Sequence, residues 1–349
     1  MKKQHHTNSS TPGHIRESDN AQKVICCAGG KSAGHILPCL TLAKKMQPHR
    51  VLFFSSNGTL DAEILGKHKL VNWHVPLPLA GARYTRPMSI IKLFFAFIIA
   101  IYHLLKHRPK QLITTGGISA LPTCCAAFLL RIPITLYELN AIPGKATKAL
   151  APLANQIAIC FPEAARFFSH QKTTLSAYPL HFDPAQIAPQ HARQNLDIPT
   201  GKKVLCIVGG SQGSQFINNA IKALFQEHPQ EADRLHIIHQ VGLNSVREQE
   251  EWYRKRGIGC HIFAYTNQLQ HYLAAADLIV CRSGAGTLFE CAALGVPFIT
   301  IPLENVAAGH QVANAVAMAR MHPNLCQVLQ QQQLLDRPSL LSNAIRKML

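Results

Sequence analysis

The sequence predicts an α/β protein with two Rossmann-like domains, each built on a doubly wound parallel sheet. A short apolar run, a glycine-containing turn and a helical pattern open each half, first over residues 24–42 and again over residues 203–225. Repeated strand-turn-helix units of this kind form parallel sheets with helices on both faces. The 349 residues, 47% of them hydrophobic, are also enough for two cores.

Four segments follow from this pattern. Residues 1–22 are polar, contain proline and glycine and have no apolar signal-peptide core, so we expect a disordered tail. An N-terminal domain is expected over residues 23–177 and a C-terminal domain over residues 201–349. Between them, four prolines within residues 178–200 would interrupt helices and strands repeatedly, which predicts a linker.

The strands and helices are expected in alternation along both halves. Buried strands are predicted at residues 24–28, 51–54, 70–75, 112–115, 134–136 and 156–160, then at 203–208, 235–240, 261–265, 278–280 and 298–301. Helices are predicted at residues 36–42, 120–130, 216–225, 246–256, 269–276 and 288–294, and from residue 310 onward.

The composition points to an anionic partner and a reducing compartment. A formal charge of +17 requires an acidic partner, but only 7% of residues are aromatic and no basic-aromatic recognition module is present. An anionic membrane surface or a phosphorylated substrate is therefore favoured over nucleic acid. The 11 cysteines include no CxxC and lie mostly in apolar runs, so we expect buried thiols, no disulfide framework and no metal.

One apolar stretch allows two interpretations. Residues 93–102 are apolar without interruption and have basic residues on both sides. Ten residues are too few to span a bilayer by themselves. The stretch is then either a buried helix of the N-terminal domain or a helix that lies on a membrane surface.

The clearest candidate site is the segment CRSGAGTLFE, residues 281–290. An apolar strand enters a small, glycine-containing turn that opens a helix, and such a helix start binds phosphate through free N–H groups and the helix dipole. Glu290 lies about one turn into the helix, where its carboxylate can accept bonds from two ribose hydroxyls. The segment predicts a nucleotide-diphosphate site.

Other candidates lie at similar turns. His35 follows the first glycine turn and can act as a general base or contact a substrate oxygen, or simply cap or pack the helix. Glu138 and Asn140 follow a strand, at the edge where open α/β sheets bind ligands, although they can equally satisfy loop backbone. His310, Gln311 and Asn314 begin a later helix, and amides there suit the hydroxyls of a sugar.

Six segments in order resemble the MurG-type glycosyltransferases, which add N-acetylglucosamine to undecaprenyl-diphospho-muramoyl-pentapeptide in peptidoglycan synthesis. They are AGGKSAGHILP, TTGGISALP, YELNAIPG, VGGSQGS, CRSGAGTLFE and AAGHQVANA, and the similarity covers roughly residues 24–329. The resemblance implies the GT-B fold, with two domains facing a cleft, and an inverting transfer that converts lipid I to lipid II. It also implies a cytoplasmic, peripheral location at the bacterial inner membrane, with roles in cell-wall biogenesis, cell shape and cell division.

The resemblance also implies the residues of each site. For UDP-N-acetylglucosamine these are Ser32, Ala33, Gly34, Asn140, His181, Ser211, Thr266, Ser283, Ala285, Gly286, Thr287, Leu288, Glu290, His310 and Gln311. For the lipid-linked acceptor they are Gly29, Gly30, Gly116, Gly117 and Ser119. His35 is implied as the base, with Glu138 as its competitor. No DxD motif is present, so we expect helix ends to replace a metal at the diphosphate, and no cofactor.

The sequence departs from the family's pattern at several positions. Lys31, Ser32 and Ala33 replace Gly-Thr-Gly of the first turn, a histidine at position 181 replaces an arginine, and Gly309 replaces an acidic residue. The sequence also ends before the helix that usually returns to the N-terminal domain. Two alternatives therefore stay open: a divergent transferase with another lipid-linked acceptor, and a non-catalytic scaffold that binds a UDP-sugar.

Overall fold

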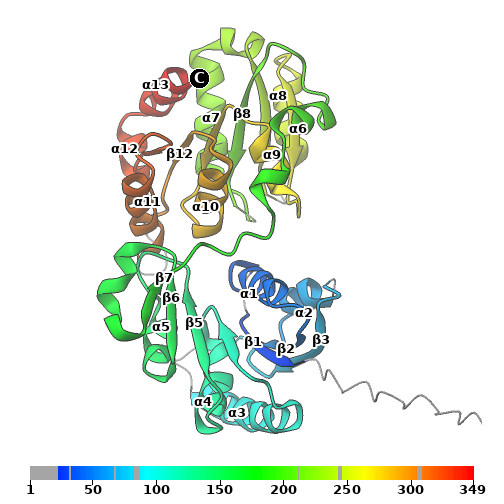
Figure 1. Cartoon of the computed structure of the whole chain (residues 1–349). Helices are drawn as coiled ribbons and strands as arrows, with labels where there is room; N and C mark the ends of the chain where they lie inside the picture. Colours follow the sequence, from blue (N-terminus) through cyan, green and yellow to red (C-terminus); the bar gives the residue numbers. More distant parts are fainter. Residues whose placement is uncertain are drawn as a thin grey trace, which may run out of the picture.

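The computed structural model describes residues 23–30, 33–66, 68–81, 87–210, 212–242, 246–304 and 309–349. Two parallel sheets form two domains, one above the other in Figure 1. The predicted Ser32 and Ser211 sites and the predicted tail over residues 1–22 lie outside the described residues.

The first sheet has seven parallel strands in the order β3-β2-β1-β4-β5-β6-β7. They are β1 (Val24–Ala28), β2 (Arg50–Ser56), β3 (Val71–Leu77), β4 (Leu112–Thr114), β5 (Ile134–Glu138), β6 (Gln156–Ile159) and β7 (Thr173–Leu175). Its helices are α1 (Ala33–Lys45), α2 (Thr59–Gly66), α3 (Pro87–His107), α4 (Leu121–Leu129) and α5 (Lys145–Leu150), with a 3-10 turn (Ile118–Ala120) before α4.

Alternating side chains of this sheet build two cores. Cys26 of β1 and Leu52 of β2 pack with α3 and α4, whereas Cys27 of β1 and Phe53 of β2 pack with α1. Successive residues of a strand point to opposite faces, and helices cover both faces, so the central strands β1, β2 and β4 are buried along nearly their whole length. The predicted doubly wound architecture is confirmed for this half.

The second sheet has six parallel strands in the order β10-β9-β8-β11-β12-β13. They are β8 (Lys203–Val208), β9 (Leu235–Gln240), β10 (Gly259–Phe263), β11 (Leu278–Cys281), β12 (Phe298–Thr300) and β13 (Cys326–Val328). Its helices are α6 (Pro189–Asn195), α7 (Gln215–Glu227), α8 (Val246–Arg254), α9 (Leu269–Ala274), α10 (Ala285–Leu294), α11 (His310–Met321), α12 (Gln331–Asp336) and α13 (Ser339–Met348). The last helix, α13, packs on the core beside α7, within the second domain.

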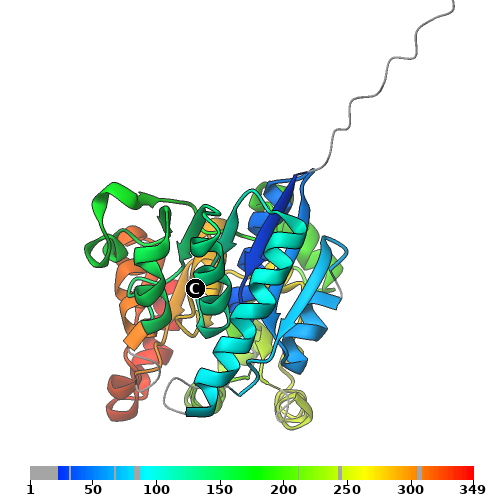
Figure 2. The same cartoon turned by 90° about the horizontal axis from the view of Figure 1, so that it is seen from below.

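Helix α3 has one buried and one exposed face. Ala96, Ala100 and Leu104 pack on the first sheet, while Ile90 is 68% and Phe94 60% exposed. The helix is 21 residues long. It is the one helix among the described residues long and apolar enough to cross a membrane by length and composition. Figures 1 and 2 show α3 and α4 on the outer side of the first domain, away from the second.

The segment predicted as a linker contains the short helix α6, whose Ala192 is buried in the second core. Pro189 stands at its first position, where a missing N–H costs nothing. Arg193 fastens α6 to the domain: its guanidinium donates to the Ala275 carbonyl at 2.8 Å and to Asp277 Oδ2 at 2.8 Å. The same Asp277 oxygen accepts from the Val204 N–H at 2.8 Å.

These contacts make Asp277 a predicted stability determinant. Asp277→Ala leaves both the Arg193 guanidinium and the Val204 N–H without their acceptor, and should lower the free energy of unfolding by about 2 to 3 kcal/mol. Urea unfolding monitored by circular dichroism measures the change. Lys203→Ala, which removes only the longer 3.6 Å ion pair to Asp277, should cost much less, and equal costs would contradict this assignment.

Candidate functional site

A cavity of about 510 Å³ lies at the edge of the second sheet where β8 and β11 end. Strand order reverses between these two strands, and ligands of open α/β sheets bind at such a reversal. The lining comes from two turns and from α11: Gly209, Gly210, Gln212, Gly213, Ser214, Arg282, Gly284, Thr287 and Gln311 are among its residues.

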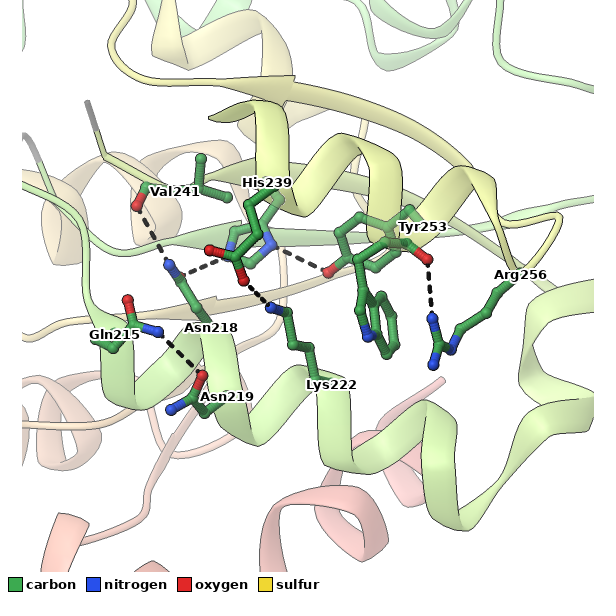
Figure 3. Close-up of polar contacts among 10 residues, drawn as sticks. Gln215, Asn218, Asn219, Lys222, His239, Val241, Tyr253 and Arg256 are labelled. Carbon is green, nitrogen blue, oxygen red and sulfur yellow. Dashed lines mark hydrogen bonds and ion pairs between the residues drawn. The ribbon is translucent and has the colours of Figure 1, made fainter. Parts of the chain in front are cut away.

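A buried polar network, drawn in Figure 3, joins α7 to the loop after β9, and this loop packs against Gly213 of the glycine turn after β8. Asn218 of α7 donates to the Val241 carbonyl at 3.2 Å, and its side-chain oxygen lies 3.1 Å from His239 Nε2. His239 therefore carries its proton on Nε2 and accepts at Nδ1 from the Tyr253 hydroxyl, 3.0 Å away. Burial lowers the pKa of His239 to about 3, so the ring stays neutral.

Arg282 brings a positive charge to the cavity. Its Nε and one terminal nitrogen donate to the Ser214 hydroxyl at 3.2 and 2.8 Å, and the other donates to the Ile301 carbonyl at 3.1 Å. Burial lowers its pKa, but a guanidinium stays charged in proteins. The sequence analysis did not single out this residue, although it is the second residue of CRSGAGTLFE.

The turn after β11 opens α10 and carries several predicted donor-site residues. Thr287 faces the cavity, and Ala285 and Gly286 begin the helix, with Gly286 against the Tyr178 hydroxyl. The Ser283 hydroxyl is fully buried and lies 2.7 Å from Thr300 Oγ1, so it braces the turn. The Leu288 side chain is also fully buried, in the second core.

Glu290 lies farther along α10, and burial raises its pKa to about 7. His181 approaches it, with Nδ1 3.7 Å from the carboxyl, and its Nε2 lies 3.3 Å from the Gln270 amide oxygen. Burial lowers the pKa of His181, so the two groups do not form an ion pair at neutral pH. A hydroxyl pair of a ligand can therefore compete for the carboxylate.

The predicted acceptor turns meet where β1 and β4 end, which is the strand-order reversal of the first sheet. A Cβ on Gly30 would lie 3.0 Å from Ser119 Oγ and 2.5 Å from Asp61 Oδ2, so there is no room for a side chain at this position. Gly116 and Gly117 have φ of 85° and 88°, which favours glycine. The Ser119 hydroxyl is buried and has no hydrogen-bond partner among the described residues.

His35 is clamped to the first sheet by Thr115. The His35 Nδ1 lies 3.1 Å from the Thr115 carbonyl, and the Thr115 hydroxyl donates to the His35 carbonyl at 2.9 Å. A carbonyl only accepts, so Nδ1 carries the proton and Nε2 keeps a free lone pair. Burial, opposed by the Thr115 contact, lowers the pKa of His35, and nearby His310 lowers it further. The ring is neutral at pH 7, as a general base must be.

Glu138 has a different environment. It is 2% exposed, and one carboxyl oxygen accepts from the Asn140 N–H at 2.8 Å and the Asn140 side chain at 3.1 Å. Burial raises its pKa to about 7 against the opposing effect of these bonds. No described hydrogen bond or ion pair joins Glu138 to His35, so the structure does not bring the two predicted catalytic residues together.

The domains meet at the loop after β5. Gly144 of this loop packs against the ring of His310, which neighbours the cavity residue Gln311. Gln311 accepts from the Leu303 N–H at 3.0 Å, and the buried Nδ1 of His310 has no described partner. Thr266, half-buried after β10, accepts from the Gln268 N–H. The described residues include no group of three His, Cys, Asp or Glu side chains placed to hold a metal ion.

Two parallel-sheet α/β domains, each with glycine turns at its strand-order reversal, form the fold of the GT-B glycosyltransferases. Models of the N-terminal and C-terminal domains of glycosyltransferase family 28 match residues 24–159 and 204–349. The chain belongs to this family, as a MurG-type member. The predicted GT-B fold class and transferase activity are thereby confirmed.

Relatives with assigned activities support the same placement. The chain is 32% identical over 304 residues to an enzyme of Thermus thermophilus, covering 85% of each chain. It is 31% identical to one of Acetivibrio thermocellus, covering 85% of this chain and 82% of the other. Both are named UDP-N-acetylglucosamine–N-acetylmuramyl-(pentapeptide) pyrophosphoryl-undecaprenol N-acetylglucosamine transferase.

Solved structures share the fold. MurG of Acinetobacter baumannii superimposes with a TM-score of 0.70 at 22% identity, covering 94% of this chain and 90% of the other. The glycosyltransferase of kitacinnamycin gives 0.67 at 16% identity, covering 94% and 91%.

Glu290 should reduce stability at alkaline pH. The pKa of Glu290 is about 7 in the folded protein and about 4.5 in a free side chain. The contribution of the protonated carboxyl to the free energy of unfolding is therefore fully present below pH 4.5 and is lost as pH rises through 7. Glu290→Gln should therefore raise the free energy of unfolding at about pH 8, by on the order of 3 kcal/mol, and change it little at about pH 4.

Thermal unfolding at both pH values measures this effect. Glu248→Gln is the matched control, because the hydrogen bond from Lys222 lowers the pKa of that exposed carboxyl. Glu248→Gln should not raise the melting temperature at about pH 8. If Glu290→Gln instead lowers the melting temperature at about pH 8, the folded protein stabilises the charged carboxylate, and the prediction is wrong.

Proposed function

We propose that this protein transfers N-acetylglucosamine from UDP-N-acetylglucosamine to a muramoyl-pentapeptide carried on undecaprenyl diphosphate, with inversion at the sugar. The observation that carries the proposal is the position of His35, at the acceptor-side turn and close to His310, whose neighbour Gln311 lines the donor cavity. The names of the relatives at about 30% identity support the choice of both substrates.

The second domain would hold the donor. The start of α10 and Arg282 would face the diphosphate, the Glu290 carboxylate would accept from the ribose hydroxyls, and Gln311 would contact the sugar. The remaining predicted contacts, Asn140, His181 and Thr266, would complete this site. The glycine turns with Gly30 and Gly117 would hold the acceptor diphosphate in the first domain.

The chemistry then follows from the groups in place. The acceptor hydroxyl oxygen attacks the anomeric carbon while its proton passes to Nε2 of His35, which is free because Nδ1 donates to Thr115. The bond from the anomeric carbon to UDP breaks, and its electron pair goes to the departing phosphate oxygen. Arg282 and the start of α10 stabilise that charge.

Loss of His35 tests this proposal. His35→Asn keeps an N–H that can reach the Thr115 carbonyl but offers no base, so kcat should fall by about 10² to 10⁴ with a nearly unchanged KM for UDP-N-acetylglucosamine. UDP release with the lipid-linked muramoyl-pentapeptide measures it, and exposed His170→Ala is the control. UDP-sugar binding by wild type without turnover on this acceptor would overturn the proposed function.

We further propose that the protein works on the cytoplasmic face of the inner membrane, as a peripheral protein. The exposed apolar side chains of α3 and α4 support this location: Met88, Ile90, Ile91, Phe94, Phe95, Ile98, Tyr102, Leu105, Phe128 and Leu129. Lys92, Lys106, Arg108 and Lys110 lie on or just after α3, where they can meet anionic headgroups.

Vesicle binding tests the location. Phe94→Ser with Phe95→Ser should reduce co-sedimentation with anionic vesicles at any salt concentration, because apolar area is lost. Lys92, Lys106 and Arg108 changed to serine should reduce it mainly at low salt. Leu335→Ser, at an equally exposed apolar residue of the second domain, should have no effect. Unchanged partitioning of both α3 variants would contradict membrane contact by this face.

A further inference from the structure

Asn314 of α11 is buried where the two domains meet, with 1% of its surface exposed. Its side-chain oxygen accepts from the Ala141 N–H at 2.9 Å. Its amide nitrogen donates to Asn140 Oδ1 at 3.1 Å and to the Ser283 carbonyl at 3.3 Å. One side chain therefore joins the loop after β5, in the first domain, to the donor turn after β11, in the second.

This contact fixes the orientation of Asn140. Because Asn140 Oδ1 accepts from Asn314, its amide nitrogen has to point to Glu138, where it donates at 3.1 Å. Glu138 is also hydrogen-bonded by the side chain of Thr147. The Thr147 hydroxyl packs against Gly116, where a Cβ would come within 2.6 Å of it. A continuous chain of contacts thus runs from the donor turn to the acceptor turn.

We propose that Asn314 is a positioning residue for transfer. Through Asn140 and Glu138 it fixes the position of the donor turn relative to the acceptor turn, without touching either substrate. The proposal rests on the proposed function. Asparagine suits this position because the side chain has to accept from one backbone N–H and donate to two oxygens. Aspartate has the same shape but offers no N–H to Asn140 or Ser283.

The pairing makes a specific prediction for Asn314→Asp. The Asn140 amide should turn over to donate to the new carboxylate, which leaves its oxygen facing Glu138. Only a protonated Glu138 can donate to that oxygen. The other titratable group described beside Glu138 is the Cys160 thiol, which stays neutral because burial and the Glu138 charge raise its pKa to about 12. The defect of the variant should therefore shrink as pH falls.

The test compares kcat and KM of Asn314→Asp with wild type across pH, using UDP-N-acetylglucosamine and the lipid-linked acceptor. At about pH 8 kcat should fall at least about tenfold, with KM for the donor and Kd for UDP within about twofold of wild type. At about pH 6 part of kcat should return through the Asn140–Glu138 link, while the bond to the Ser283 carbonyl stays lost. The double variant Asn314→Asp with Glu138→Gln is compared with Glu138→Gln alone. The ratio of their kcat values should not change with pH, because a glutamine offers an N–H at every pH.

Controls separate this role from a loss of stability. Ser342→Ala removes a buried hydrogen-bonding hydroxyl of α13, far from the donor turn, and should lower the melting temperature while leaving kcat unchanged. Asn314→Ala, which cannot restore the bond at any pH, should be equally defective at both pH values. An inactive wild type would count against the proposed function itself. Two results with an active wild type would overturn the role of Asn314. In the first, Asn314→Asp loses melting temperature but keeps its kcat, as Ser342→Ala should. In the second, its only change is a higher KM for the donor.

Discussion

The reversal of strand order in each parallel sheet is the constraint on which the rest of the structure depends. All strands of a sheet point the same way, so every following loop emerges at one edge, and the loops diverge only where the order reverses, between β1 and β4 and between β8 and β11. The two glycine turns of each domain lie at these points. The loops after β5 and β6 then bring the domains together, because Ala141 of the first loop and Phe161 of the second are buried in the second core.

Local signals predicted the glycine turns and most strands, but not the three-residue edge strands β7 and β13, which are too short to give an apolar run. Strands such as β8 are continuous apolar runs followed by glycine, and both features come from residues adjacent in sequence. The roles of Arg282 and Asn314 were not predicted, because they depend on Ser214, 68 residues away, and on Asn140, 174 residues away. The exposure of α3 was equally open, since an apolar run fits a core helix and a membrane-facing one. Only the packing of Ala96 and Ala100 on the sheet shows which face of α3 is exposed.

Two carboxyl groups with a raised pKa lie on either side of the domain contact, and they differ in what surrounds them. Glu138 accepts hydrogen bonds from Asn140, which stabilise its charged form and oppose the effect of burial. For Glu290, burial is the single cause of the raised pKa, and its neighbour His181 is neutral. An arginine at position 181 would pair with Glu290 permanently. Histidine leaves the carboxylate unpaired and places no fixed charge beside it. Among the described residues that line the cavity, Arg282 is the cation.

The position of α3 relates the proposed membrane-contacting face to the proposed acceptor site. A helix that follows a parallel strand starts at the carboxyl edge of the sheet, so Met88 and Ile90 lie toward the edge that carries Gly30 and Gly117, and Leu105 lies toward the opposite edge. Helix α4 begins two residues after Ser119 and packs along α3. A diphosphate held at the acceptor turns would therefore have its lipid close to the exposed apolar side chains. With α3 on the outer side of the first domain, the proposed membrane contact would leave the second domain pointing away from the bilayer.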